Sequence, residues 1–174
     1  MTRETQAFIA LGGNVGDVVA AFAHAVQRLS QSGAHVVQLS RVFRTPPWGK
    51  LDQPDFLNMV VDVRTALSGH ELLALCLVIE TEQGRDRFEH WGPRTLDLDI
   101  LIFGDEVSQT PELTLPHPRM WERAFVLVPL ADCAPDLVVA DRSVQEALAE
   151  LDASAIKPDD ALSQRLRDLV SLHP

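Results

Sequence analysis

The sequence contains few cysteines and no long hydrophobic run. Its two cysteines, Cys76 and Cys133, lack a Cys-x-x-Cys spacing, so neither a disulfide framework nor a zinc site is indicated. Both are expected to be small buried residues. No hydrophobic run reaches the roughly 18 residues of a membrane span, and the polar N-terminus lacks the apolar stretch of a signal peptide. We therefore expect a cytoplasmic protein with no membrane partner.

The sequence is also poor in positive charge. It has 15 basic and 25 acidic residues, a net charge of −10, which argues against binding to nucleic acid. Only Lys50 and Lys157 are lysines. Arginines dominate instead and suit forked contacts with phosphate groups. Five of them fall between positions 85 and 123: Arg85, Arg87, Arg94, Arg119 and Arg123.

The length of 174 residues fits one domain with a sizeable hydrophobic core. We expect residues 1–174 to form this single domain, with the core at about 6–150 and a helical tail at about 151–174. The single-domain length suggests that the chain works alone, and we expect a monomer.

Hydrophobic periodicity and turn residues predict alternating strands and helices. The predicted order is strand 7–11, helix 18–29, strand 35–43, loop 44–54, strand 56–65, helix 69–83 and strand 97–103. This order predicts an α+β fold with a ferredoxin-like βαββαβ core, a four-stranded antiparallel sheet with two helices on one face. Extra helices are expected to end near residue 131 and to lie near 143–151 and 159–172. The last residues are expected to pack on the sheet edge or to fray.

Local signals support the helix starts. Asp17 and Ser68 are predicted N-caps, and Glu71 completes a capping box with Ser68. Gly12 and Gly13 are predicted to halt the first strand in a tight turn, because the segment matches neither a P-loop nor a Gly-x-Gly-x-x-Gly motif. The polar segment 85–91 has the length and composition of a mobile lid.

The segment 91–103 carries the strongest chemical signal. Asp97 and Asp99 alternate at the head of the last predicted strand, so both point to one face. The apolar run from Ile100 to Phe103 predicts a core strand covered on both sides, not an edge strand. Two interpretations of the carboxylates are open. They hold a cation such as Mg²⁺, or Asp97 caps a turn while Asp99 pairs with an arginine such as Arg94.

Three sequence blocks resemble one enzyme family. They are Phe43-Arg44-Thr45-Pro46-Pro47-Trp48-Gly49 continuing through 52–58, then Glu80 through Gly84-Arg85-x-Arg87, then Trp91-Gly92-Pro93-Arg94-Thr95-Leu96-Asp97-Leu98-Asp99. With Leu115-Pro116-His117-Pro118, they closely resemble 6-hydroxymethyl-7,8-dihydropterin pyrophosphokinase over roughly residues 6–150. The resemblance implies transfer of pyrophosphate from ATP to the pterin hydroxymethyl group in folate biosynthesis, with release of AMP.

The resemblance also implies roles for individual residues. Asp97 and Asp99 would hold two Mg²⁺ ions, and Arg85 and Arg94 would contact the phosphates and stabilise the transition state. The implied ATP contacts are Glu80, Arg85, Arg87, Trp91, Arg94, Ile100, Thr114, His117 and Arg123. The implied pterin contacts are Thr45, Pro46, Trp48, Phe56, Asn58, Trp91 and Phe125. Partners are therefore these two small molecules.

Some positions depart from the family pattern. Trp48 stands where a smaller aliphatic residue is common, and Phe56 where tyrosine is frequent. Leu77 replaces a glutamine and Pro118 an aromatic residue, which bears on the nucleotide contacts at both positions. Two other functions are compatible with the same fold: a catalytically silent pterin-binding module, and a related phosphotransferase with another flat substrate. Retention of both aspartates and the arginines favours an active enzyme.

Overall fold

The computed structural model describes residues 2–47, 49, 51–84 and 95–171. The first part contains β1 (Thr5–Gly13), α1 (Val18–Gln31), β2 (Ala34–Leu39), β3 (Phe43–Thr45), β4 (Phe56–Thr65), α2 (Gly69–Glu82) and β5 (Asp97–Phe103). The second part contains β6 (Ser108–Gln109), β7 (Thr114–Leu115), the 3-10 turn η1 (Met120–Glu122), α3 (Ala124–Cys133), β8 (Val138–Val139), β9 (Arg142–Ser143), α4 (Val144–Ala149), β10 (Lys157–Pro158) and α5 (Asp160–Ser171). The predicted lid at 85–91 lies outside the described residues.

The main sheet is antiparallel, with the order β10-β3-β4-β1-β5 and with β2 also paired to β4. β1 and β4 therefore occupy the centre, and β5 lies on the other side of β1 from β4. This order of the first, third and last core strands is that of a ferredoxin-like fold, and the predicted fold class is confirmed.

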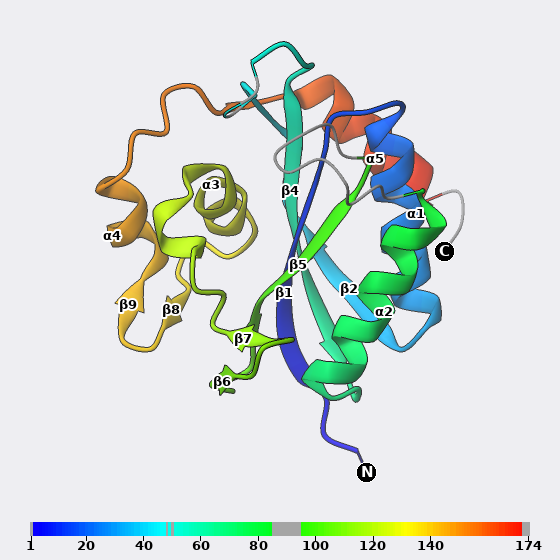
Figure 1. Cartoon of the computed structure of the whole chain (residues 1–174), viewed down its shortest axis with the longest axis vertical. Coiled ribbons are helices and arrows are strands. Elements are labelled where there is room, and N and C mark those ends of the chain that lie inside the picture. The colour runs from blue at the N-terminus through cyan, green and yellow to red at the C-terminus, as the bar shows by residue number, and fades with distance from the viewer. Residues whose placement is uncertain (1, 48, 50, 85–94, 172–174) are drawn as a thin grey trace.

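The two faces of the sheet are covered by different helices (Figure 1). One face packs against α1, α2 and α5 through a large hydrophobic cluster that includes Leu11, Met59 and Leu98. The other face packs against α3 and α4 through a second cluster that includes Phe8, Val60 and Leu101. Alternation along each strand separates the two sets, because neighbouring residues point to opposite faces. Cys76 and Cys133 are buried free thiols, as predicted.

Local sequence signals placed the helix starts correctly. The Asp17 side chain accepts a hydrogen bond from the Ala20 amide at 3.1 Å, and Ser68 and Glu71 form the predicted capping box at the start of α2. These caps satisfy amides that have no partner within their own helix. Among the described residues, no helix is long and apolar enough to cross a membrane.

The predicted strand 35–43 is wrong as one element. It is divided into β2 and β3, which pair with different parts of β4. Between them the Arg41 amide donates to Asp132 Oδ2 at 2.8 Å, and the Val42 amide donates to Ser163 Oγ at 2.8 Å. Side chains distant in sequence thus accept the backbone hydrogen bonds that a neighbouring strand would otherwise accept. The predicted loop 44–54 also begins later, because β3 continues to Thr45.

The prediction that 97–103 is not an edge strand is wrong for the part of the chain that is described. β5 pairs only with β1 there, although its apolar part, residues 100–103, is buried on both faces as predicted. Its outer backbone is partly satisfied, since the His117 amide donates to the Leu101 carbonyl at 2.8 Å. A covered edge and a central strand have the same apolar composition, which explains the error.

The predicted turn at Gly12 and Gly13 is also wrong, because β1 continues through both residues. The turn follows at Gly16, whose φ of 71° suits glycine. Gly12 meets a different demand: a Cβ there would lie 3.0 Å from Asn58 Oδ1. The missing side chain at Gly12 leaves room for the Asn58 amide.

Candidate active site

Two polar side chains and a glycine form one row across three strands of the sheet. Gly12 of β1 pairs with Asn58 of β4 on one side and with Asp97 of β5 on the other. Directly opposed residues in antiparallel strands share a face, so Asn58 and Asp97 flank the bare backbone of Gly12. Asp99 lies in the next row, opposite Ala10. That row also contains Val60, which packs in the cluster beneath α3 and thereby identifies the face.

The two carboxylates form the candidate metal-binding end of this row. Asp97 is half-buried and Asp99 is exposed, and they alternate on one face as predicted. The described residues contain no group of three or more histidine, cysteine, aspartate or glutamate side chains able to hold a metal. Mg²⁺ commonly uses one or two carboxylates and takes its other oxygens from water and substrate phosphates. Two hard oxygen donors beside an uncovered glycine backbone fit that requirement.

His117 lies close enough to Asp99 and to Arg123 for both charges to act on its ring. The backbone hydrogen bond from His117 to β5 positions the ring beside the strand. Burial lowers the pKa of His117, Asp99 acts in the opposite direction, and the positive charges of Arg123 and Arg119 lower it further. The Arg119 amide donates to His117 Nδ1 at 3.2 Å, so the neutral ring carries its proton on Nε2. The fold thus joins two predicted ATP contacts to a predicted metal ligand.

The residues expected at the pterin rim lie at the other end of the row. Thr45 pairs with Phe56, and Asn58 Nδ2 donates to Thr45 Oγ1 at 3.0 Å. Phe56 and Asn58 share a face through the alternation of β4, as predicted. Pro46 directly follows β3. These contacts bring the predicted polar rim together with one predicted stacking ring.

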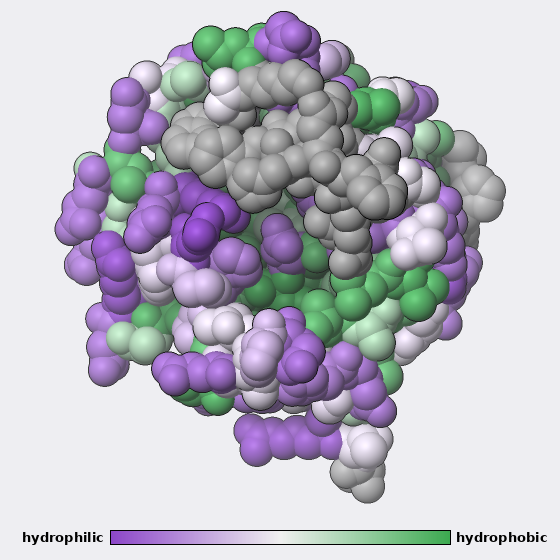
Figure 2. Space-filling view, in the orientation of Figure 1, coloured by the Kyte–Doolittle hydropathy of each residue, from purple (hydrophilic) through white to green (hydrophobic). Residues whose placement is uncertain are grey.

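The second predicted stacking ring comes from α3. Phe125 lies in the first turn of that helix, is partly buried and packs against the second cluster. The Arg123 guanidinium carbon lies 5.7 Å from the centre of its ring. Since α3 packs against β4, Phe125 belongs to an element that covers the face carrying Asn58. Figure 2 shows the surface hollowed between α3 and α2, with hydrophobic and hydrophilic atoms in the hollow.

Other predicted contacts lie away from this row. The Ile100 side chain is buried in the first hydrophobic cluster, so only its backbone is available for the predicted ATP contact. Glu80 is 1% exposed near the end of α2, and Thr114 lies half-buried in β7. Trp48, Arg85, Arg87, Trp91 and Arg94 lie outside the described residues.

Sequence reasoning missed the contributions of Gly12 and Asn14. Gly12 is a site residue because of strand pairing that the local sequence does not reveal. Asn14 is 5% exposed, and its Nδ2 donates to Gln53 Oε1 at 2.8 Å and to the Pro54 carbonyl at 3.0 Å. It therefore ties the turn after β1 to the segment that leads into Phe56. An asparagine directly after two glycines was the available signal.

Comparison with known proteins gives one consistent result. Residues 8–135 match the sequence model of the family described as 7,8-dihydro-6-hydroxymethylpterin-pyrophosphokinase. A 2-amino-4-hydroxy-6-hydroxymethyldihydropteridine pyrophosphokinase of Methylorubrum extorquens is 49% identical over 154 residues, which cover 88% of this chain and 98% of the relative. A protein of the same name from Bacillus subtilis is 50% identical over 127 residues, or 72% of this chain and 76% of the relative.

Solved structures agree on the fold. A Plasmodium falciparum HPPK-DHPS triple mutant crystallised with pteroate superposes with a TM-score of 0.70 at 13% identity. The match covers 90% of this chain and 47% of the other, so this chain spans about half the length of that solved protein. At this identity the likeness concerns the fold.

Proposed function

This chain belongs to the 7,8-dihydro-6-hydroxymethylpterin-pyrophosphokinase family, and we propose that it transfers the terminal pyrophosphate of ATP to the hydroxymethyl group of 6-hydroxymethyl-7,8-dihydropterin in folate biosynthesis. The hydroxymethyl oxygen attacks the β-phosphorus, the bond from that phosphorus to the α,β-bridging oxygen breaks, and AMP leaves. The hydroxyl proton is lost to solvent. The observation that carries the proposal is the row of Asn58, Gly12 and Asp97, with Asp99 in the next row.

The proposed pterin contacts and the proposed metal ligands belong to strands of one sheet, which supports a shared site. Such a reaction depends on in-line positioning and spread positive charge more than on a strong base. Strand pairing fixes the separation of Asn58 from Asp97, because both residues are registered to Gly12. The sheet would thereby hold the acceptor hydroxyl at a fixed position relative to the phosphates.

Asp97 and Asp99 would hold the magnesium. When bound, the metal neutralises phosphate charge and lowers the pKa of the attacking hydroxyl. We propose that two ions bind there, with Asp97 and Asp99 as the protein residues that would hold them. Titration of Mn²⁺ with a non-hydrolysable ATP analogue should give two ions per chain, and a single ion would contradict this number.

The pterin slot uses polar groups at its rim. The Asn58 amide donates to the Thr45 hydroxyl, which keeps its own proton for donation to the ligand. Asn58 Oδ1 lies over Gly12, where it can accept from the amino group of the pterin. Phe56 and Phe125 would stack on the flat ring, with Pro46 at its edge. Trp48 and Trp91 retain the pterin contacts implied by the resemblance.

The nucleotide would be held largely by groups from the chain that follows β5. His117 would present its Nε2 proton, and Arg123 would add a forked positive charge near His117. Glu80, the Ile100 backbone and Thr114 complete the proposed adenosine and ribose contacts. Arg85, Arg87 and Arg94 retain the phosphate roles implied by the resemblance.

We propose that residues 1–174 form one domain that acts as a cytoplasmic monomer. Pairing of β10 with β3 and packing of α5 against α1 support inclusion of the tail in that domain. Sedimentation at working concentrations should give the mass of one chain, 19.2 kDa. A stable dimer would contradict the proposed oligomeric state.

The decisive experiment mixes the protein with ATP, Mg²⁺ and 6-hydroxymethyl-7,8-dihydropterin and separates the nucleotide products. AMP should form in equal amounts with pterin diphosphate, and omission of either Mg²⁺ or the pterin should stop its formation. Release of ADP would indicate transfer of a single phosphoryl group. That result, or no product, would contradict the proposed activity.

A further inference from the structure

The C-terminal segment β10–α5 lies beyond residues 8–135, the part that matches the family. It is nevertheless attached to the end of the sheet that carries the pterin slot. The backbone of β10 pairs with β3, which places it next to the strand ending at Thr45. The segment therefore lies behind one wall of the slot.

The first attachment holds β3. The Asp159 amide donates to the Val42 carbonyl at 2.8 Å, and the Val42 amide donates to the buried Ser163 Oγ at the same distance. An ion pair between Arg44 Nη2 and Asp159 Oδ2, 2.9 Å long, adds a side-chain contact. Both polar groups of the Val42 backbone are thus bound by the tail, immediately before β3 begins.

The second attachment holds the turn after β1. Arg165 donates to Asp17 through Nη1 at 2.8 Å and through Nη2 at 2.6 Å. Asp17 also caps α1, and Asn14 in the same turn bonds to Gln53 and to the Pro54 carbonyl. Arg165 is therefore connected through two residues to the segment that precedes Phe56.

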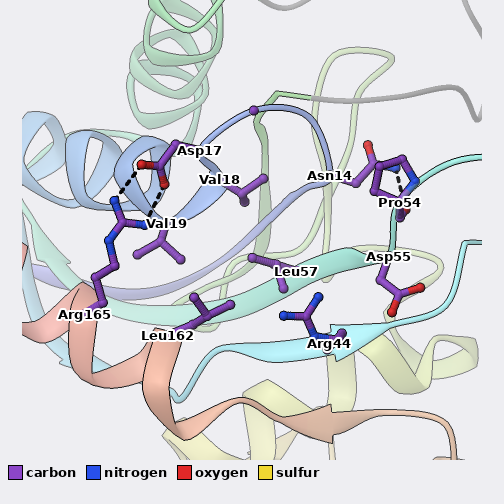
Figure 3. Close-up of a pocket in the computed structure, with 11 residues that line it drawn as sticks. Asn14, Asp17, Val18, Val19, Arg44, Pro54, Asp55, Leu57, Leu162 and Arg165 are labelled. Carbon is purple, nitrogen blue, oxygen red and sulfur yellow. Dashed lines mark hydrogen bonds and ion pairs between the residues drawn. The ribbon is translucent and has the colours of Figure 1, made fainter.

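A cavity of about 230 Å³ separates the two attachments. Its lining includes Asn14, Asp17, Arg44, Asp55, Leu162 and Arg165 (Figure 3). Because these residues line an open pocket, the turn and the 54–55 segment do not pack closely against α5 there. Their position depends instead on the polar contacts at the rim of the cavity.

The forked contact suits a positioning role better than a stabilising one. The Arg165 and Asp17 side chains are 45% and 51% exposed, and exposed pairs contribute little to global stability. Two parallel hydrogen bonds nevertheless fix orientation as well as distance. The contact therefore constrains the turn without being a main support of the core.

We propose that α5 positions the pterin slot, with Arg165 acting through Asp17 and Asn14 on the segment before Phe56, and Ser163 acting through Val42 on β3. Thr45, Phe56 and Asn58 are then held at the spacing the pterin requires. The inference rests on the proposed function, because the ligand that it concerns is the pterin. Arg165 is a positioning residue and touches neither substrate.

The test compares pterin binding by Arg165→Ala and Asp17→Asn. Asparagine keeps the helix cap but loses the charge that pairs with Arg165. In both variants the Kd and KM for the pterin should rise about fivefold, as expected of a small misplacement, while kcat and the KM for ATP stay within about twofold. The double variant should lose no more than either single one. Arg165→Lys should recover part of the affinity.

Arg167→Ala is the matched control. Arg167 lies on the same helix, and its Nη2 bonds only to Gln164 within α5, 3.0 Å away, among the described contacts. Its pterin Kd should equal that of the unaltered protein. Unchanged pterin binding in both test variants would overturn the inference. So would equal rises in both KM values accompanied by a lower Tm. If the unaltered protein binds no pterin, the proposed function fails and the inference with it.

Discussion

The two faces of the sheet are built from the same strand segments but serve different purposes. On one face Leu11, Leu57 and Leu98 are buried beneath α1, α2 and α5. On the other face their neighbours Gly12, Asn58 and Asp97 form the polar row. A shift of one position along each strand thus separates core from site. The alternation of the strand allows one segment to supply both.

The two faces differ in the hydrophobic cluster that lies between the sheet and its helices. The first cluster continues along the whole sheet, from Ala7 and Val63 at one end to Leu11 and Leu57 at the other. The second cluster, beneath α3 and α4, contains Phe8 and Val60 but neither Asn58 nor Asp97. Asn58 and Asp97 lie next to that cluster on the same face, at the end of the sheet that carries the candidate site. Stability and chemistry should therefore respond to different substitutions within the same strands.

The largest predicted effect is on the polar row. Asp97→Ala or Asp99→Ala should lower kcat about a thousandfold or more, because a metal contributes several kcal/mol of charge stabilisation. Folding should be little affected, since loss of one carboxylate relieves repulsion in the metal-free protein. Turnover and Tm should be measured on the same preparations.

Asp105→Ala is the control for a change of charge, because Asp105 is exposed just after β5. Its kcat should be unchanged. Full activity in either the Asp97 or the Asp99 variant would remove the metal assignment.

A substitution on the face that packs against α1, α2 and α5 should lower stability rather than turnover. Leu98→Ala, one residue from each aspartate, removes a side chain that is 3% exposed in the first cluster. It should cost about 3 kcal/mol of unfolding free energy and lower Tm by about 10 °C. Turnover per folded molecule should stay within about threefold, provided that β5 keeps its register. Denaturant unfolding and active-site titration separate the two quantities. A thousandfold loss of kcat at full stability would contradict the division between the faces.

Sequence alone identified much of this arrangement, but only its local part. Helix caps at Asp17 and Ser68 depend on residues three positions apart, and the alternation of Asp97 with Leu98 needs no partner strand. The pattern therefore determined which side chains share a face. The family resemblance supplied their chemistry.

Pairing between distant segments could not be read in the same way. The break at residues 40–42 depends on Asp132 and Ser163, which are 91 and 121 positions from their partners. The edge position of β5 was hidden because helices and the segment at His117 bury it. Gly12 was interpreted as a turn residue for the same reason, since its neighbours Asn58 and Asp97 come from other strands.

A smaller effect is expected from Gly12→Ala. The new Cβ would lie 3.0 Å from Asn58 Oδ1, so the amide must move by a few tenths of an ångström. The pterin Kd should rise about tenfold, since misplaced contact groups lose affinity steeply. Binding can be followed by pterin fluorescence.

A double-mutant cycle provides the control for Gly12→Ala. If the substitution acts through Asn58, it should change the pterin Kd by less than about twofold when Asn58 is already alanine. An equally large change in that background would place the effect elsewhere in the row.

The smallest predicted effect concerns an exposed contact between α1 and α2, away from the buried cluster. Glu82 at the end of α2 accepts from Arg28 of α1, with a shortest distance of 2.8 Å, and from His24 at 2.9 Å. These hydrogen bonds, first that of Arg28 and then that of His24, lower the pKa of Glu82 to about 2. Because the folded pKa lies below the usual 4.5, the contribution to stability is present above that pH and is lost as pH falls towards 2.

Glu82→Gln should lower Tm by no more than about 3 °C at pH 7, and the difference should vanish near pH 2. Melting curves across this range test it against Leu98→Ala. A loss as large as that of the leucine variant would mean that surface pairing, rather than the buried cluster, holds α1 and α2 on their face of the sheet.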